Sequence, residues 1–325
     1  MNRFALSSLL ILALSLFACS TQAAQATLPA PVVNASQATA TTAPAPTFPL
    51  TLTDGLQRTI TLPAPAQRIV SLAPSNTEIL FAIGAGPQLV GRDVLSDFPP
   101  EAQAVTDIGD TFIGLNTELI VSLQPDLVLA AEITPDEQVA QLEQLGITVY
   151  WLANPLDFEG LYANLILIGQ MTGRETEATD LATSLQARVA AVEAAVAART
   201  ETPSVFYELD ASDPAAPWTS GAGTFIDLII SQAGGRNAGA GLVGTFAQIS
   251  IEELLVQNPE VILLGDAAYG VTVESVGQRA GWSGLAAVQS GSLYPFDDSL
   301  VSRPGPRLIE ALEELARLLH PDLFD

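Results

Sequence analysis

The chain has 325 residues, enough for two domains of ordinary size that each bury a core. It carries 36 acidic residues against 12 basic ones, all of them Arg, so its formal net charge is −24. Binding to nucleic-acid phosphates needs a basic surface, so no nucleic-acid partner is expected. Anionic lipid surfaces would also repel the chain unless something tethers it.

The first 19 residues supply a candidate tether. Arg3 precedes an apolar run over residues 4–18, which is typical of a secretory signal and too short for a usual membrane span. The run ends in "LFAC", which resembles a lipoprotein signal-peptidase site. We expect residues 1–19 to be a lipoprotein-type signal peptide, with Cys19 as the lipidated first residue of the mature chain. Cleavage of an ordinary signal near "TQAAQA" is the alternative.

Residues 20–47 consist mainly of Ala, Thr, Pro, Gln and Ser. Such a composition buries too little apolar surface to offset the entropy of ordering, so we predict a disordered stalk. Because Cys19 is the only cysteine, the folded part can hold no disulfide and must be stabilised by packing alone.

Beyond the stalk, strand and helix patterns alternate. "TFPLTLTDGLQRTITLP" predicts a β-hairpin that turns at Asp54 and Gly55. "RIVSLA" is a short buried strand, and "PSNTEILFAIGAG" predicts a helix whose N-cap is Ser75, with Glu78 completing a capping box. The same order recurs as "QLVGR" before "FPPEAQAV", "LVLA" before "TPDEQVAQLEQLG", and "TVYWLA" before "DFEGLYANLILIGQMTG". This spacing predicts a parallel α/β sheet.

A long helix is predicted next, from about residue 174 to residue 199. No Pro or Gly interrupts 174–202, apolar residues step by three and four, and Pro203 follows. The strand–helix alternation then restarts with "SVFYELD", "TFIDLIISQAGG", "SIEELLVQN" and "EVILLG", and closes with "PRLIEALEELARLLH".

An internal repeat links the two halves. Residues 111–130 match residues 245–264 without a gap, at an offset of 134 (252 − 118). Each copy is expected to begin a helix at an N-cap, Asn116 or Ser250, and to turn at a proline into a buried strand. The identical pairs are Thr111 and Thr245, Phe112 and Phe246, Glu118 and Glu252, Pro125 and Pro259, and Leu129 and Leu263.

The predicted fold is therefore α/β, with two Rossmann-like lobes joined by one long rigid helix. We assign an N-terminal lobe to residues 48–173, the linking helix to 174–202 and a C-terminal lobe to 203–325. Clefts between domains are preferred ligand sites, so the ligand is expected between the lobes.

The chain lacks the patterns of known catalytic and cofactor sites. His320 is its only histidine, and no HExxH, Walker loop, CxxC or GxSxG with a downstream His partner occurs. The glycine-rich "GAGTF" and "GAGLVG" do not form a strand-linked GxGxxG. We predict no catalytic residue, no resident cofactor and no metal ligands, and therefore not an enzyme. A periplasmic enzyme of unknown chemistry is the alternative.

Several segments resemble a known family. "RIVSLAPSNTEILFAIGAGPQLVG", "SDFPPEA", "IGDTFIGLNTELIVSLQPDLVLA", "WTSGAGTFIDLIISQAGGRN" and "RPGPRLIEALEELARLLHP" resemble the periplasmic binding proteins that feed ABC importers of cobalamin, haem and ferric siderophores. The resemblance covers about residues 48–325. It implies two lobes bridged by one helix, and a monomer that delivers its ligand to an ABC permease dimer. It also implies an extracytoplasmic location, either lipid-anchored or periplasmic.

The resemblance is closest to the cobalamin-binding branch, because "SDFPPEA" is similar to that branch's "SDYPPEA". Phe112 and Trp218 would offer flat faces to a tetrapyrrole-like ring. Leu95 is a departure, since an aromatic residue stands there in the cobalamin binder compared. The ligand-contacting positions that the resemblance implies are Pro74, Ser75, Leu95, Phe98, Phe112, Trp218, Asp298 and Arg303.

Other ligands of the family are weighed by their chemistry. Haem binders usually ligate iron through Tyr or His, and no Tyr precedes Tyr150. Capture of zinc or manganese needs several histidines, and the chain has one. Anionic ferric siderophores would need Arg92, Arg236 or Arg303, and they are the alternative to cobalamin. Cobalamin carries its own metal and needs no protein ligand for it.

The repeated carboxylates also have an implied role. In the proteins that this chain resembles, one Glu at the top of each lobe docks onto Arg residues of the two permease subunits, which points to Glu118 and Glu252. The alternative is that both only complement the positive end of a helix dipole, worth about 0.3–1 kcal/mol. Glu253 is expected to complete a capping box with Ser250, which would leave Glu252 free for docking.

Overall fold

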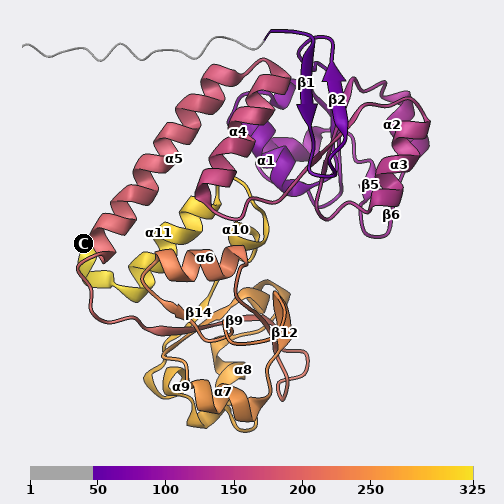
Figure 1. Ribbon diagram of the computed structural model, residues 1–325. Helices are drawn as coiled ribbons and strands as arrows, with labels where there is room; N and C mark the ends of the chain where they lie inside the picture. The colour runs from indigo at the N-terminus through magenta and orange to yellow at the C-terminus, as the bar shows by residue number, and fades with distance from the viewer. Residues whose placement is uncertain (1–46, 325) are drawn as a thin grey trace, which may run out of the picture. The chain divides into compact units, whose positions relative to one another are not determined.

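The computed structural model describes residues 47–324 (Figure 1). The predicted signal peptide, Cys19 and the stalk up to residue 46 lie outside the described residues. Within the described part of the chain, no helix combines the length and apolar character needed to cross a membrane.

The N-terminal lobe contains the predicted hairpin and a four-stranded parallel sheet in the order β4-β3-β7-β8. The "FPPEAQAV" segment is a short 3₁₀ turn and not the α-helix that its place in the pattern predicts. The elements of this lobe are β1 (Leu50–Thr53), β2 (Thr59–Leu62), β3 (Ile69–Ser71), α1 (Pro74–Ala82), η1 (Gly86–Gln88), β4 (Leu89–Arg92), η2 (Pro100–Ala104), β5 (Gly109–Asp110), β6 (Gly114–Leu115), α2 (Thr117–Ser122), β7 (Leu127–Ala131), α3 (Asp136–Gln144), β8 (Val149–Leu152) and α4 (Phe158–Thr172).

The C-terminal lobe contains a six-stranded mixed sheet in the order β12-β10-β9-β13-β14, with β11 on β9. Strands β13 and β14 run parallel to β9, whereas β10 is antiparallel to β9 and β12. The elements are β9 (Ser204–Asp210), β10 (Trp218–Ser220), α6 (Phe225–Gln232), β11 (Arg236–Asn237), β12 (Phe246–Gln248), α7 (Ile251–Gln257), β13 (Val261–Leu264), η3 (Gly265–Tyr269), α8 (Val273–Gly277), η4 (Trp282–Gly284), α9 (Ala286–Ser290), β14 (Leu293–Pro295), α10 (Ser299–Ser302), α11 (Leu308–Leu319) and η5 (Pro321–Leu323).

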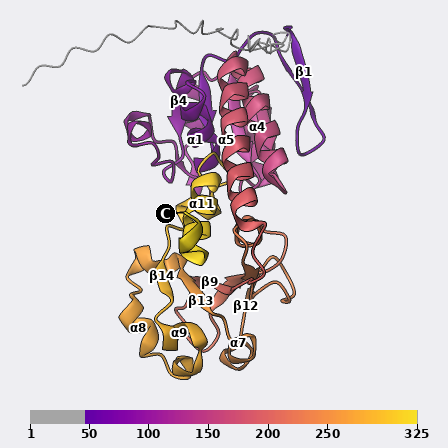
Figure 2. The same ribbon diagram turned by 90° about the vertical axis from the view of Figure 1, so that its left-hand side faces the viewer.

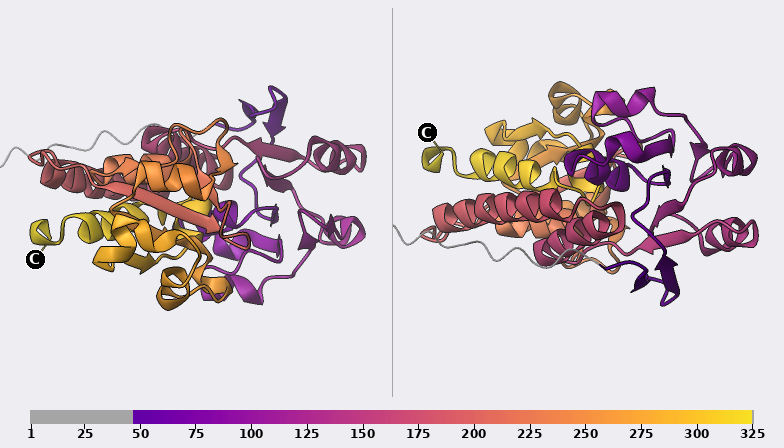
Figure 3. Two further views of the ribbon diagram at one scale, coloured as in Figure 1. Left: turned by 90° about the horizontal axis from the view of Figure 1, so that it is seen from below. Right: turned by 90° about the horizontal axis from the view of Figure 1, so that it is seen from above.

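Helix α5 (Glu175–Val196) links the two sheets, and it ends three residues before the predicted end at 199. It lies along α4 and contacts α11, as Figures 2 and 3 show. Its buried face includes Leu185, Val189 and Val192, as the periodicity predicts. Arg188 of α5 donates to both carboxylate oxygens of Glu313 on α11, at 2.8 and 2.9 Å. The helix is therefore tied to both lobes.

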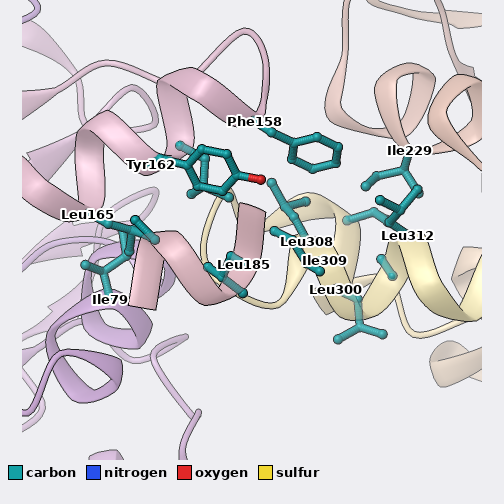
Figure 4. Close-up of a cluster of buried hydrophobic side chains, with 14 of the residues drawn as sticks. Ile79, Phe158, Tyr162, Leu165, Leu185, Ile229, Leu300, Leu308, Ile309 and Leu312 are labelled. Atoms are coloured by element: carbon teal, nitrogen blue, oxygen red, sulfur yellow. The ribbon is translucent and has the colours of Figure 1, made fainter. Parts of the chain in front are cut away.

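One hydrophobic cluster runs through both lobes and the linking helix. It includes Ile79 of α1, Leu165 of α4, Leu185 of α5, Ile229 of α6 and Leu312 of α11 (Figure 4). Each Å² of apolar surface buried in this core stabilises the fold by about 25 cal/mol. Close packing of the side chains also leaves the helices little room to slide past one another. The two lobes are thus packed as one unit around α4, α5 and α11.

The internal repeat is confirmed in the structure. Each copy is a short helix, α2 or α7, followed by a buried parallel strand, β7 or β13. The residue before the proline is left-handed in both copies, with φ of 47° at Gln124 and 42° at Asn258. This conformation ends the helix and turns the chain back into the sheet, which explains why the proline follows at the same position.

The acidic residue after the proline also has the same role in both lobes. The Asp126 carboxylate accepts hydrogen bonds from the backbone N–H groups of Gln67 (2.8 Å) and Arg68 (3.0 Å), just before β3. In the second copy, Glu260 accepts from the N–H of Ser204 at 2.9 Å, at the start of β9. Each carboxylate therefore fixes the beginning of the neighbouring strand.

The predicted caps of α2 and α7 are confirmed, but the capping box predicted for α7 is wrong. Asn116 Oδ1 accepts from the N–H of Leu119 at 3.0 Å, and Ser250 Oγ accepts from the N–H of Glu253 at 3.1 Å. The Glu253 carboxylate instead accepts from the Gln257 side chain at 2.8 Å. The Glu253 carboxylate thus binds a side chain one turn further along the same helix, and not the backbone N–H of the N-cap residue.

We expect Asp126→Ala to lower the free energy of unfolding by about 1–2 kcal/mol, because two backbone donors lose a charged acceptor. Urea denaturation followed by circular dichroism would measure the change. Asp180→Ala is the matched control, since Asp180 is an exposed carboxylate on α5 without a side-chain partner among the described residues. Equal midpoints for both variants would contradict the strand-capping role.

Candidate ligand-binding site

A cavity of about 600 Å³ lies between the two lobes. Most of its walls are loops that follow parallel strands, namely β3, β4, β7 and β8 in one lobe and β13 and β14 in the other. Ligand sites in open α/β sheets lie at the carboxyl ends of strands, as here. The lining residues are Ala73, Pro74, Ser75, Leu95, Asp97, Phe112, Ala131, Ile133, Asn154, Gly265, Ala268, Tyr269, Asp297, Asp298, Ser299, Ser302, Arg303 and Pro304.

Six of the eight predicted ligand-contacting residues line this cavity. Three are contributed by segments directly after β3 and β4, one by the β5–β6 turn, and two by the segment after β14. Their role in binding stays a prediction. The six are Pro74, Ser75, Leu95, Phe112, Asp298 and Arg303.

Phe98 and Trp218 are not among the lining residues. The ring of Phe98 lies against the Arg307 guanidinium, whose carbon is 4.0 Å from the ring centroid, in a cation–π contact. Trp218 starts β10 and pairs in the sheet with Asp210 and Gln248. The structure therefore brings neither ring to the cavity.

Tyr269 is the most exposed large side chain of the cavity, at 89 %, and the sequence reasoning missed it. Asn154, Asp97 and Asp297 were also missed. Each of the four lies within five residues of a strand end, so the residues after every predicted strand were the available signal. Phe112, at 65 % exposure, is the second large ring in this cavity.

An ion-pair network joins the lobes beside the cavity. Glu78 of α1 was predicted to cap its own helix, but Ala73 occupies the N-cap and Glu78 is buried at 3 % exposure. Its carboxylate accepts from Arg307 at 2.6 and 2.9 Å and from Arg303 at 3.3 Å. Partners 225 and 229 residues away thus replace the local cap.

Arg303 also donates to Asp97 Oδ1 at 2.6 Å. Burial acts to lower the pKa of Arg303, but the hydrogen bond and charge of Asp97 and the charge of Glu78 outweigh it and raise that pKa. For Asp97, burial acts to raise the pKa, and the bond to Arg303 holds it below its usual value. Both groups are therefore charged at neutral pH.

Tyr207 positions Asp298 from beneath the cavity. Its hydroxyl donates to Asp298 Oδ1 at 2.8 Å, and the ring is 1 % exposed. Burial, followed by the charge of Asp298, raises the pKa of Tyr207, so the hydroxyl remains a donor. Gly265 leaves space for this contact, because a Cβ there would lie 2.5 Å from the Tyr207 oxygen.

A second charged group lies next to the wall formed by η3. Arg279 donates to both carboxylate oxygens of Glu208, which has no solvent exposure. Burial raises the pKa of Glu208 to about 7, and nearby Asp266 acts in the same direction against the bonds from Arg279. Among the described residues, no group of three or more His, Cys, Asp or Glu is arranged to hold a metal ion.

We expect Glu78→Gln to destabilise the protein by about 3 kcal/mol or more, because two largely buried guanidinium groups lose their shared counter-charge. Asp97→Asn is the control and should cost less than about 1 kcal/mol, since the Asp97 side chain is 57 % exposed. Urea unfolding curves of the two variants would be compared. Losses of similar size would show that the network does not depend on Glu78.

Comparisons with known proteins agree with this architecture. Residues 69–300 match the family model described as periplasmic binding protein. An ABC transporter substrate-binding lipoprotein of Bacillus subtilis, described as uncharacterized, is 36 % identical over 282 residues, which cover 85 % of this chain and 87 % of that protein. The vitamin B12-binding protein of Salmonella typhimurium is 31 % identical over 256 residues, covering 78 % and 90 %.

Among solved structures, the periplasmic haem-binding protein of Roseiflexus in its apo form aligns with a TM-score of 0.71 and 30 % identity. The alignment covers 79 % of this chain and 99 % of that one. The matched segment includes most of both lobes and the linking helix. The chain therefore belongs to the periplasmic binding protein family and is a substrate-binding component of an ABC importer.

Proposed function

We propose that the protein captures a corrinoid such as cobalamin in the cavity between its lobes and delivers it to an ABC permease. The observation that carries the proposal is the chemistry of the cavity wall. Two exposed rings, Phe112 and Tyr269, line the cavity. Among the described lining residues Arg303 is the one basic side chain, and it already binds the carboxylates of Glu78 and Asp97. Such a wall suits a large ring with amide groups that carries its own metal.

The relatives support the same ligand. Vitamin B12-binding proteins and a cobalamin-binding protein match most of this chain. Members of the family are substrate-binding transport proteins and not enzymes. This agrees with the sequence, which offers no catalytic pattern.

Anionic ferric siderophores are less well supported by the geometry. Arg92 is buried and donates to the backbone oxygens of Ala102 and Asp93. Arg236 lies in β11 and does not line the cavity. Arg303 is neutralised by its partners, so none of the three arginines offers an unpaired charge to an anion within the cavity.

Haem is the second candidate because of Tyr269. No Tyr of the N-terminal lobe is among the lining residues, but Tyr269 of the C-terminal lobe is. A phenol oxygen can ligate haem iron. A haem-binding protein is also among the structural neighbours. Loss of an iron–phenolate absorption band in Tyr269→Phe would distinguish this candidate from a corrinoid.

We expect cyanocobalamin to bind purified residues 48–325 in a calorimetric titration, whereas an anionic ferric siderophore should give no saturable heat. Phe112→Ala should weaken binding by about 1–3 kcal/mol if the ring stacks on the ligand. Phe246→Ala is the matched control: it is the repeat partner of Phe112, it is half-exposed, and it lies outside the cavity.

Trp218→Ala should also leave affinity unchanged if the ligand stays within the cavity. Saturable binding of the siderophore and none of cyanocobalamin would overturn the assignment. Equal loss in the Phe112 and Phe246 variants would assign Phe112 a structural role only.

We further propose that Glu118 and Glu252 dock onto basic residues of the two permease subunits. Both are exposed in the first turn of equivalent helices, α2 and α7. Among the described residues, neither carboxylate forms a side-chain hydrogen bond or ion pair. Glu253 does not form the expected capping box, so it gives no support to docking by Glu252. The docking proposal is supported by the exposure of Glu118 and Glu252, by their equivalent positions in the repeat and by the family resemblance.

Glu118→Arg and Glu252→Arg should each reduce transport and complex formation while ligand affinity stays unchanged. The double variant should nearly abolish transport and complex formation. The loss should depend on ionic strength, since exposed charges are screened by salt. Glu274→Arg is the control, because Glu274 is also exposed in a first helical turn. Normal transport by both single variants at physiological salt would leave only the helix-dipole role.

The location and the domain division remain proposals as well. We propose that the mature chain begins at a lipidated Cys19 and that residues 20–47 connect this anchor to the folded residues 48–325. The Bacillus subtilis relative is described as a lipoprotein, which supports an extracytoplasmic anchor. We propose that lobes 48–173 and 203–325 with linking segment 174–202 act as a monomer.

A further inference from the structure

The cavity wall has an uncompensated negative charge. Three carboxylates line it, Asp97, Asp297 and Asp298, against the single guanidinium of Arg303. The formal charge of these lining side chains is therefore −2. Loops after β4 and β14 supply the carboxylates, so the charge comes from both lobes.

Arg303 is not free to bind an anionic ligand. It donates to Asp97 at 2.6 Å and to Glu78 at 3.3 Å, and Glu78 is also bound by Arg307. A ligand anion would have to displace Asp97 and would still face two carboxylates. The one positive group in the wall therefore serves the contact between the lobes.

Asp297 and Asp298 each retain one carboxylate oxygen that is free to accept a hydrogen bond. Asp297 Oδ1 accepts from the N–H of Ser299 at 3.0 Å, and Asp298 Oδ1 accepts from Tyr207 at 2.8 Å. Within the described residues, their Oδ2 atoms make no hydrogen bond, and neither group pairs with an Arg.

The charge next to the wall does not offset this. Glu208 and Asp266 are both buried, and Arg279 pairs with Glu208. The Oδ1 atom of Asp266 has no hydrogen-bond partner in the described part of the chain. Asp266 directly follows Gly265, which lines the cavity, and it forms no ion pair among the described residues.

We propose that the cavity selects ligands that carry net positive charge, and prefers a cationic metal macrocycle to an uncharged or anionic one. This inference rests on the proposed function and names the charge class of the substrate. Two uncompensated carboxylates within several ångströms of a cation should favour it about three- to tenfold at moderate salt. The cation would lie over the C-terminal lobe, next to the free Oδ2 atoms.

The test compares ligands that share a skeleton and differ in charge. Aquacobalamin is a cation at any pH below the pKa of its cobalt-bound water. Cyanocobalamin has the same corrin ring but is neutral. Ferrioxamine B carries a free ammonium group, whereas its N-acetylated form does not. All four would be titrated into residues 48–325 by calorimetry. His320 is 4 % exposed, so it should not replace the cobalt-bound water.

In the pair of compounds that binds, either the cobalamins or the ferrioxamines, we expect the cationic compound to bind about three- to tenfold more tightly than the neutral one. This advantage should shrink as the salt concentration rises. The combined Asp297→Asn and Asp298→Asn substitutions should remove this difference in affinity between the two members, because Asn carries no charge but can still accept from Tyr207. Asp180→Asn is the control for loss of a carboxylate outside the cavity, since Asp180 is an exposed residue of α5, and it should keep the full advantage.

The possible failures are distinguishable. Equal affinity within a binding pair, or tighter binding of the neutral member, overturns the charge preference and leaves the proposed function standing. A preference that persists in the double Asn variant overturns the role of Asp297 and Asp298. Binding of none of the four compounds overturns this inference together with the proposed function.

Discussion

The Glu78 carboxylate is the contact on which the cavity depends. It is nearly without solvent exposure and holds two guanidinium groups that lie more than 220 positions away in the chain. Breaking such a buried pair leaves uncompensated charge, so the interaction fixes α1 against α10 and α11. Because Pro74 and Ser75 of α1 and Arg303 after α10 all line the cavity, the same contact positions both of its walls.

The hydrophobic cluster acts in the same direction. It continues from Ile79 through α4 and α5 into α6 and α11, so the two sheets share one packed core (Figure 4). A closely packed core resists sliding, and hinge closure usually requires a smaller and more polar contact between domains. The cavity is therefore largely pre-formed, and the side chains of its wall decide which ligand it accepts.

The structural use of Arg303 changes how the cavity should be interpreted. An arginine in a ligand cleft suggests an anionic ligand, but this one is bound to carboxylates on both sides. The side chains that remain accessible include the rings of Phe112 and Tyr269 and the carboxylates of Asp297 and Asp298. The chemistry of the site thus follows from which charges the fold has already paired, and not from the residue types alone.

The sequence by itself determined the features that have a local signature. The alternating strands and helices and the N-caps Asn116 and Ser250 depend on residues within a few positions of each other, and the repeat is a direct match between two segments of the sequence. An acidic residue follows the proline in both copies of the repeat, but its contact with the neighbouring strand has no local signature in the sequence. Family resemblance then placed six side chains at the cavity.

Only the tertiary structure decided the partners of Glu78, the neutralisation of Arg303 and the position of Tyr269 in the wall. Ser75 and Glu78 have the spacing of a capping box, yet Glu78 pairs across the molecule. Phe98 likewise packs on Arg307 and not in the cavity. Partners separated by more than 200 residues leave no periodicity in the sequence, and a buried charge takes the best partner that the fold brings near.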